Sequence, residues 1–382
     1  MELAFLKPLF ARPGPWASVY IETTRATEDA AKIQKLRERA IAGQLIDAGA
    51  DGYTTRAVME RLAHEPVSGT PPGRALFAAG AEVVLDVPLA LPPPVGGATW
   101  SLLPHVAPLA ALRGETPACL VAYIDRMGAD LELREGHRRT AVGEARGTEW
   151  QGRGHRGVPA DRYEWHYRNK VENGWNETAD IIVAEIVRQW PQSGAELLVL
   201  AGDVRERRAV HNRLPDRVRD VTVELESGGR SAGSATAALD REIEQAGAAY
   251  AQGRLRTALE RFHRGRGKPG QHRESSVDTG PGEAAEGIPA VVDAARNHQV
   301  ATLLLTPEAA DAGRQVWVGP GVDEVAVQRG EARAMGVPRP EQARADDALL
   351  RAAAAADCDV LVVPEGMRGP AGGLGAVLRW SM

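Results

Sequence analysis

Asp359-Val-Leu-Val-Val-Pro364 is an apolar run, and a short turn rich in Gly and Pro separates it from Gly372-Gly-Leu-Gly-Ala-Val-Leu-Arg-Trp380. An apolar run of this length predicts a buried parallel strand, and the turn predicts a closing strand at the rim of the same domain. Upstream of this pair, the pattern predicts helices at 288–297 and 343–356 and strands at 300–305 and 315–318. Because helices and strands alternate, the C-terminal part is expected to be a small α/β/α sandwich.

A similar alternation marks the middle of the chain. A strand at 118–125, a turn at Met127-Gly128 and an alternating strand at 129–134 predict a hairpin. A long polar excursion, residues 136–174, follows before an amphipathic helix at 176–190, for which Asn176 can act as N-cap. Further on, the pattern predicts strands at 196–201 and 221–225 and a helix at 204–214. This order favours a mostly parallel sheet.

The N-terminal part shows a strand at 16–21, a charged helix at 28–46 and strands at 74–80 and 82–87. Pro92-Pro93-Pro94 and Gly96-Gly97 then predict a loop or linker that passes Val106 and Leu109. A helix is expected from about Thr236 to His263. With 382 residues, the chain suits three domains, which we place at 1–115, 116–238 and 239–382.

The composition favours a folded protein, since 43% of the residues are hydrophobic and 25% are charged. The N-terminal segment lacks a basic leader and a cleavage site, and no apolar run reaches the roughly 18 residues that a membrane-spanning helix needs. We therefore expect a cytoplasmic protein without a membrane partner. Cys119 and Cys358 lie in apolar surroundings, which predicts two buried thiols.

Positive charge is concentrated locally although the formal net charge is −5. Residues 134–170 hold nine Lys or Arg against five Asp or Glu, and residues 254–273 hold seven against the single acid Glu260. Such segments can bind phosphate at chosen places without coating nucleic acid in general. The second segment also fits a solvated helix end with no partner, which is the simpler interpretation of a charge run.

The polar excursion carries the candidate site. The segment reads Gly152-Arg-Gly-His-Arg-Gly157, which matches the dinucleotide-binding pattern G-x-G-x-x-G. A dinucleotide site needs a strand before this pattern and a helix after it. Here the preceding residues, Glu144–Gln151, are polar and Pro159 follows, so a dinucleotide site is not favoured. An RNA-contacting loop is favoured over a plain surface loop, because arginine both pairs with phosphate and stacks on bases. The predicted RNA-binding residues are Arg146, Gln151, Arg153, His155, Arg156, Arg162, Tyr163, Trp165, His166 and Arg168.

Two alternatives stay open for Arg162–Arg168, which interleaves aromatic residues with Arg and His. It can stack on unpaired bases, or it can be a helix or strand that packs Trp165 against its own domain. His155 and His166 do not have zinc-ligand spacing with Asp161 and Glu164, so no metal is expected. The sequence also lacks a serine-nucleophile elbow and a phosphate-binding loop, and we expect no cofactor.

Several segments resemble the archaeo-eukaryotic release factor and Pelota family. They are Gly14–Tyr20, Ala118–Asp125, Val300–Leu305 and, above all, Gly372–Trp380, which is similar to the segment that closes the third domain in that family. The likeness spans nearly the whole chain and is greatest to the bacterial branch with mycobacterial stress-associated members and the hibernation factor Balon. It implies a ribonuclease H-like middle domain, an L7Ae-like C-terminal domain and docking in the ribosomal A site.

One departure from the family concerns catalysis. Release factors of this family carry Gly-Gly-Gln in the polar loop, where it helps to position water against the peptidyl-tRNA ester. The corresponding place here reads Trp150-Gln-Gly-Arg-Gly-His-Arg-Gly157, in which Gln151 precedes its glycine. A misplacement of about 1 Å can cost roughly a hundredfold in rate, so we do not expect efficient release.

The resemblance therefore implies a ribosome hibernation or stress factor that occupies the A site of the 70S ribosome and contacts 23S and 16S rRNA without catalysis. Elongation factor Tu is an implied partner at the third domain. DNA and membranes are not implied partners. The alternative is a peptidyl-tRNA hydrolase or release-type enzyme that acts through Gln151.

Overall fold

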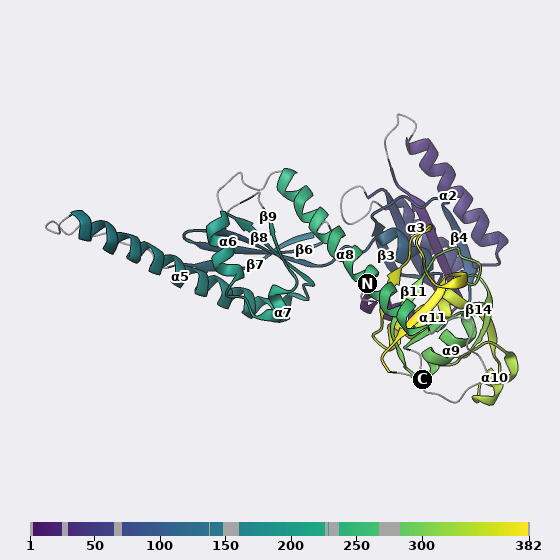
Figure 1. The fold of residues 1–382 in the computed structure, drawn as a ribbon. Helices are drawn as coiled ribbons and strands as arrows, with labels where there is room; N and C mark the ends of the chain where they lie inside the picture. The colour runs from purple at the N-terminus through teal and green to yellow at the C-terminus, as the bar shows by residue number, and fades with distance from the viewer. Residues whose placement is uncertain are drawn as a thin grey trace, which may run out of the picture. The chain divides into compact units, whose positions relative to one another are not determined.

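The computed structural model describes residues 3–24, 30–64, 71–136, 138–147, 160–225, 228, 237–266 and 283–380, without the side chains of residues 4, 30, 31 and 160–175. It shows an α/β fold with four sheets (Figure 1). The chain forms two compact units, which are residues 1–114 together with 255–382 (unit 1) and residues 115–254 (unit 2). Among the described residues, no helix is both long and apolar enough to span a membrane.

The N-terminal part of unit 1 is an antiparallel sheet in the order β3-β2-β1-β4. One face of β1 presents Ala17, Val19 and Ile21 to two helices. Asp51 begins the second of these helices by accepting hydrogen bonds from the N–H groups of Tyr53 and Thr54. The elements are η1 (Ala4–Leu6), α1 (Lys7–Phe10), β1 (Trp16–Glu22), α2 (Ala30–Asp47), α3 (Gly52–Ala63), β2 (Gly73–Ala79), β3 (Glu82–Leu89), β4 (Gly97–Ser101) and α4 (Ala107–Arg113).

The C-terminal part of unit 1 holds two further sheets, in the orders β10-β16-β11-β15 and β13-β12-β14. In the first sheet, β11 pairs parallel with β15 and antiparallel with the closing strand β16, as the sequence predicts. The elements are β10 (Ala284–Glu286), α9 (Ile288–Arg296), β11 (Val300–Leu305), β12 (Gln315–Val318), β13 (Val325–Ala326), α10 (Arg329–Ala334), β14 (Glu341–Arg344), α11 (Ala345–Ala355), β15 (Asp359–Val362), η2 (Ala371–Gly373) and β16 (Leu374–Leu378).

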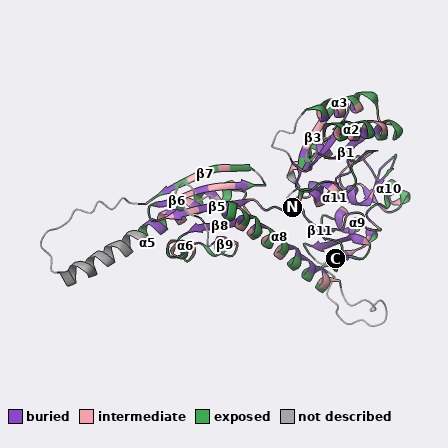
Figure 2. Cartoon of the chain, turned by 90° about the horizontal axis from the view of Figure 1, so that it is seen from above, coloured by how far each residue is buried: buried purple, intermediate pink, exposed green. Residues whose placement is uncertain are grey.

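Unit 2 is a five-stranded sheet, β7-β6-β5-β8-β9, with helices on both faces. Strand β5 is buried on both sides, with Leu120, Ala122 and Ile124 against α5, α6 and α7, and Cys119 and Val121 against α8 (Figure 2). The elements are β5 (Cys119–Asp125), β6 (Gly128–Glu135), β7 (Arg138–Arg146), α5 (Ala160–Ser193), β8 (Leu197–Gly202), α6 (Val204–His211), α7 (Asp216–Arg219), β9 (Thr222–Leu225) and α8 (Ala237–Gly265), which continues into unit 1.

Most expected elements are present and both thiols are buried, but four predictions are wrong. The expected linker after Pro92-Pro93-Pro94 contains β4 and α4. The polar excursion at 136–174 contains the edge strand β7 and the first turns of α5. Asn176 lies inside α5 and cannot be its N-cap. The middle sheet is mixed, because β5, β8 and β9 are parallel whereas β6 and β7 run antiparallel.

A buried polar junction joins the two parts of unit 1. Asp347 of α11 accepts hydrogen bonds from the N–H groups of Val106 and Ala107, at 2.9 and 3.4 Å, and so caps the N-terminus of α4. Its other oxygen lies 2.9 Å from Nδ1 of His105. Tyr20 donates its hydroxyl to the His105 carbonyl at 2.7 Å and accepts from the Leu109 N–H. The junction thus ties β1 and α4 to α11.

Charge in the junction is balanced by Arg344, which donates to both oxygens of Asp346 at 3.1 and 2.7 Å. Burial lowers the pKa of His105, but the hydrogen bond and the charge of Asp347 outweigh it, so that the pKa is raised. Burial, together with the charge of Asp347, raises the pKa of Asp346 to about 6. Both groups therefore hold a proton more strongly in the folded protein than in the unfolded chain.

Because both pKa values are raised on folding, the stabilisation is present at low pH and is lost as the pH rises through the folded-state values. We expect the free energy of unfolding of unit 1 to fall by about 1–3 kcal/mol between pH 5 and pH 8. Asp346→Asn should flatten this fall, which hydrogen exchange of the α4 amides measures after correction for the intrinsic rate. An unchanged pH profile in the variant would show that Asp346 does not titrate in this range.

Candidate functional site

The site lies where two parallel strands of unit 2 end. Strands β5 and β8 pair in register up to Ile124 and Gly202, and Asp125 and Asp203 come next at this edge of the sheet. Gly202 has φ +148°, and a Cβ there would lie 2.2 Å from the Ile124 carbonyl oxygen, so only glycine fits. Asp203 caps α6 directly afterwards by accepting from the Arg205 N–H. In α/β sheets, the carboxyl ends of parallel strands are the usual place for ligands.

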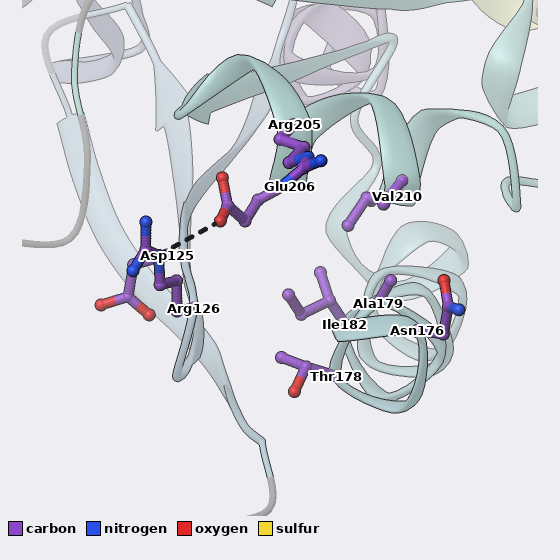
Figure 3. Close-up of a pocket in the computed structure, with 10 residues that line it drawn as sticks. Asp125, Arg126, Asn176, Thr178, Ala179, Ile182, Arg205, Glu206 and Val210 are labelled. Carbon is purple, nitrogen blue, oxygen red and sulfur yellow. Dashed lines mark ion pairs between the residues drawn. The ribbon is translucent and has the colours of Figure 1, made fainter. Parts of the chain in front are cut away.

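A cavity of about 300 Å³ opens at this edge, between the β5–β6 turn, α5 and α6 (Figure 3). Its apolar wall is aliphatic, and its polar groups come from all three elements. The apolar residues are Ala179, Ile182, Ala209 and Val210. The polar and charged residues are Asp125, Arg126, Asn176, Thr178, Arg205 and Glu206.

Glu206 is the buried charged group of the cavity. Its side chain is only 10% exposed, and Oε1 lies 3.6 Å from Nε of Arg126, which is long for a strong ion pair. Within the described part of the chain, no hydrogen-bond donor reaches the buried Oε2. Burial raises the pKa of Glu206, and the neighbouring Asp203, which accepts a hydrogen bond from protonated Glu206, raises it further. When protonated, Glu206 donates its proton to Asp203, so what it offers to a ligand is a hydrogen-bond acceptor.

The cavity adjoins the place where the polar segment, defined as residues 146–168, leaves the sheet. Gly147 donates its N–H to the Met127 carbonyl at 2.7 Å. It packs so closely on α5 that a Cβ there would lie 2.6 Å from Oγ1 of Thr178. Further along β7, Gln189 of α5 donates to the Val142 carbonyl at 2.6 Å. These contacts fix the root of the polar segment against the same helix that forms one wall of the cavity.

The sequence-predicted RNA-binding residues fall into three groups. Arg146 is exposed at the end of β7 and pairs with Glu144 at 2.9 Å. Gln151, Arg153, His155 and Arg156 lie outside the described residues, as does the G-x-G-x-x-G match. The remaining residues lie on α5, where only the backbone is described, so that the stacking and packing interpretations are both still open. They are Arg162, Tyr163, Trp165, His166 and Arg168.

Sequence reasoning missed the cavity, although one signal was present. Asp125 is the last residue of β5 and Asp203 directly follows β8, and acidic groups at the ends of neighbouring parallel strands lie at one edge of the sheet. Arg126, Thr178 and Glu206 carry no such signal, because they come from three elements that are brought together only by folding.

A cluster of possible metal ligands lies in unit 1. Ligand atoms of His105, Asp346 and Asp347 lie within 4.8 Å of one another. The Arg344 guanidinium already supplies positive charge there, and the two N–H groups at the start of α4 occupy one Asp347 oxygen. We therefore interpret this cluster as the structural junction described above.

Residues 118–268 match the model of the protein family described as "Bacterial archaeo-eukaryotic release factor family 2". The matched segment contains the sheet, the cavity and the polar segment. This segment of the chain is therefore similar to the bacterial archaeo-eukaryotic release factors. The family resemblance predicted from the sequence is thus confirmed, as is the α/β fold class.

Two Mycobacterium tuberculosis proteins are similar over almost the entire chain. "Uncharacterized protein Rv2629" of strain ATCC 25618 / H37Rv is 28% identical over 392 residues, which cover 98% of this chain and 96% of the relative. The counterpart in strain CDC 1551 / Oshkosh gives the same values. These relatives extend the similarity to known proteins beyond the middle segment of the chain.

Solved structures give weaker likenesses. A ribosome-bound archaeal Pelota is 15% identical, covers 99% of this chain and 94% of its own, and has a TM-score of 0.36. Pelota of Archaeoglobus fulgidus is 12% identical, with coverage of 81% and 80% and a TM-score of 0.31. With TM-scores below 0.5, these superpositions do not establish a shared arrangement of domains.

The contact at the root of the polar segment predicts a specific coupling. Gly147→Ala places a Cβ against Thr178 and should lower the free energy of unfolding of unit 2 by about 1–3 kcal/mol. Thr178→Ala removes the clashing atoms, so the double variant should lose less than the sum of the two single losses. Urea unfolding of the four proteins measures this coupling.

Gly253→Ala is the matched control, because this helical glycine has no heavy atom within 4 Å of the added Cβ. It should stabilise α8 by about 0.5–1 kcal/mol. Purely additive losses at positions 147 and 178 would contradict the close approach of β7 to α5.

Proposed function

We propose that this protein is a ribosome-binding factor of the release-factor type, which occupies the A site of the 70S ribosome without catalysing peptide release. In this role it serves as a hibernation or stress factor in the cytoplasm. The observation that carries the proposal is the family match over residues 118–268, which includes a polar segment without Gly-Gly-Gln. The segment keeps the family's place in the chain and lacks the family's catalytic tripeptide.

The chemistry of ester cleavage supports a non-catalytic role. Hydrolysis of peptidyl-tRNA needs a water held in line with the ester carbon, and small displacements of that water are costly in rate. In Trp150–Gly157, the glycines alternate with Gln151, Arg153 and other polar residues, so no glutamine follows two glycines. The arginines in this stretch instead suit contacts with phosphate and with unpaired bases.

Charge distribution supports RNA as the partner of the polar segment. Residues 134–170 carry nine Lys or Arg against five acids in a chain whose formal net charge is −5. In the part of unit 2 that the structure describes, Arg134 and Arg139 are paired with Asp240, and Arg146 with Glu144. The RNA-binding charge is therefore assigned to the arginines from Arg153 to Arg168.

The remaining domains take their roles from the family. We divide the chain into an N-terminal domain (1–115), a ribonuclease H-like middle domain (116–238) and an L7Ae-like C-terminal domain (239–382). In the A site, the first domain lies toward the 16S rRNA of the decoding region and the polar segment lies near 23S rRNA. Elongation factor Tu is the proposed companion at the third domain.

A release assay tests the absence of catalysis. Ribosomes that carry peptidyl-tRNA in the P site should release no more peptide with the wild-type protein than with Gln151→Ala, because neither positions a water. A release factor active on the same ribosomes is the positive control. Release by the wild type that disappears in Gln151→Ala would identify a peptidyl-tRNA hydrolase and overturn the proposal.

A sedimentation assay tests ribosome binding. Replacement of Arg153, Arg156, Arg162 and Arg168 by alanine should weaken co-sedimentation with 70S particles at least tenfold. It should also reduce the slope of log K against log salt concentration by about 3, since each lost phosphate contact removes about 0.7–0.9.

The matched control carries four alanines at exposed arginines outside the polar segment, with the same change in charge. These positions are Arg208, Arg217, Arg333 and Arg339. The control should bind within about threefold of the wild type, because distant charges are screened. Equal losses in the two variants would show that net charge, and not the polar segment, governs binding.

A further inference from the structure

The cavity at the ends of β5 and β8 has no role in the proposed function. We propose that it binds a single unpaired nucleotide of an RNA, with the base against the aliphatic wall and the phosphate at Arg126 and Arg205. That this RNA is ribosomal rests on the proposed function. That the cavity binds a nucleotide is argued from the cavity alone.

The size of the cavity limits its occupant. A volume of about 300 Å³ lies at the lower end of the range for small-molecule sites, which is about 300–1,000 Å³. One base with its ribose fits this space, whereas a duplex or a folded protein segment does not. The opening is formed by the β5–β6 turn and by two helices, so that a strand of RNA can pass outside while one nucleotide enters.

The wall of the cavity suits the face of a base. Ala179 and Ile182 of α5 and Val210 of α6 are buried, and the two α5 residues lie across the cavity from Arg126 and Glu206 (Figure 3). Every base has a flat apolar face, so an aliphatic surface holds any of them without selecting a sequence. Burial of the face of the base against this aliphatic wall contributes to affinity through the hydrophobic effect, even where some polar atoms of the base have no partner in the cavity.

The polar groups suit the edge of a base. Glu206 is nine-tenths buried, and no donor from the described residues reaches its Oε2, although the atom is shielded from water. A carboxyl in this state accepts a hydrogen bond from an exocyclic amino group, as Asp and Glu do with N4 of cytosine. Thr178 adds a hydroxyl on the facing helix. The cavity therefore favours bases with an amino group over uracil.

The charged rim suits a phosphate. Arg126 lines the cavity with its side chain 73% exposed, and its Nε lies 3.6 Å from Oε1 of Glu206. Arg205 is exposed at the first turn of α6, on the same rim. Two guanidinium groups beside an aliphatic pocket match the order of phosphate and base in a nucleotide.

The position of the cavity agrees with this role. Thr178, which lines it, also contacts Gly147 at the root of the polar segment. An RNA strand bound by the arginines of the polar segment therefore runs close to the cavity. A nucleotide held there would fix the register of the strand, which charge alone does not do.

The test uses the full-length protein and two kinds of probe. The first is CMP, with UMP for comparison, and the second is single-stranded C10 RNA, with its C10·G10 duplex for comparison. Binding is followed by NMR shift changes for the nucleotides and by fluorescence anisotropy for the labelled RNAs. We expect CMP to bind more tightly than UMP and single-stranded C10 to bind more tightly than the duplex.

Three variants probe the cavity directly. Ala209→Leu places a larger side chain on the half-buried face of α6 that lines the cavity, and it should weaken CMP and C10 binding at least tenfold. Glu206→Gln should reduce the preference for CMP over UMP to less than twofold. Arg205→Ala should weaken C10 binding about fivefold, whereas Arg208→Ala, an exposed arginine of the same helix outside the cavity, should not change it. Circular dichroism and the thermal midpoint establish that each variant is folded.

The inference is overturned if no nucleotide binds saturably, if folded Ala209→Leu binds CMP as the wild type does, or if CMP binds but C10 does not. Its failure can be distinguished from failure of the proposed function. A protein that binds CMP in the cavity but does not sediment with 70S particles would retain the inference and lose the ribosomal role. If the wild type sediments normally with 70S particles, but the Ala209→Leu variant binds CMP as well as the wild type does, the proposed function is retained and the inference about the cavity is lost.

Discussion

The close approach of β8 to β5 at Gly202 is the constraint on which the middle of this protein depends. A side chain at that position would meet the Ile124 carbonyl oxygen, so the two strands end side by side only because glycine stands there. Asp203 can then cap α6 at once, and α6 and α5 pack on the same face of the sheet. The cavity is the space that remains where these two helices and the β5–β6 turn diverge.

The same sheet explains how one domain can combine a rigid body with the segment that we propose to contact RNA. Its central strands are buried on both faces and supply the stability. Its antiparallel edge strand β7 has exposed charges and ends at Arg146, and the next residue, Gly147, is held by Met127 and by α5. The polar segment therefore starts from a fixed point. A segment that is anchored at its start loses less conformational entropy on binding than an unanchored chain would.

Much of the fold could be predicted from the sequence, because buried strands and amphipathic helices carry their own periodicity. Strands β1, β5, β8 and β11 were placed within about two residues in this way. Strand β7 was missed because an edge strand with one solvated face reads as polar, as Arg138–Arg146 does. Helix α4 was missed because its cap, Asp347, comes from a residue 240 positions away. No local pattern can reveal such a partner.

The candidate site also has a part that could be predicted from the sequence and a part that could not. The arginine-rich composition of the polar segment is visible in the sequence, and the family that Ala118–Asp125 and Gly372–Trp380 resemble is the one whose model residues 118–268 match. The cavity is invisible there, because a buried glutamate whose Oε2 meets no donor among the described residues arises only from the packing of α6 against the β5–β6 turn. Charge patterns are local and can be found in a sequence, whereas pKa shifts and cavities depend on contacts between distant residues.

A cryo-EM map of the protein bound to 70S ribosomes with peptidyl-tRNA in the P site tests the central claim most directly. The account predicts density for the middle domain in the A site, with the arginines of the polar segment against 23S rRNA and an intact ester bond on the tRNA. Density at another ribosomal site, or a deacylated P-site tRNA beside Gln151, would contradict it.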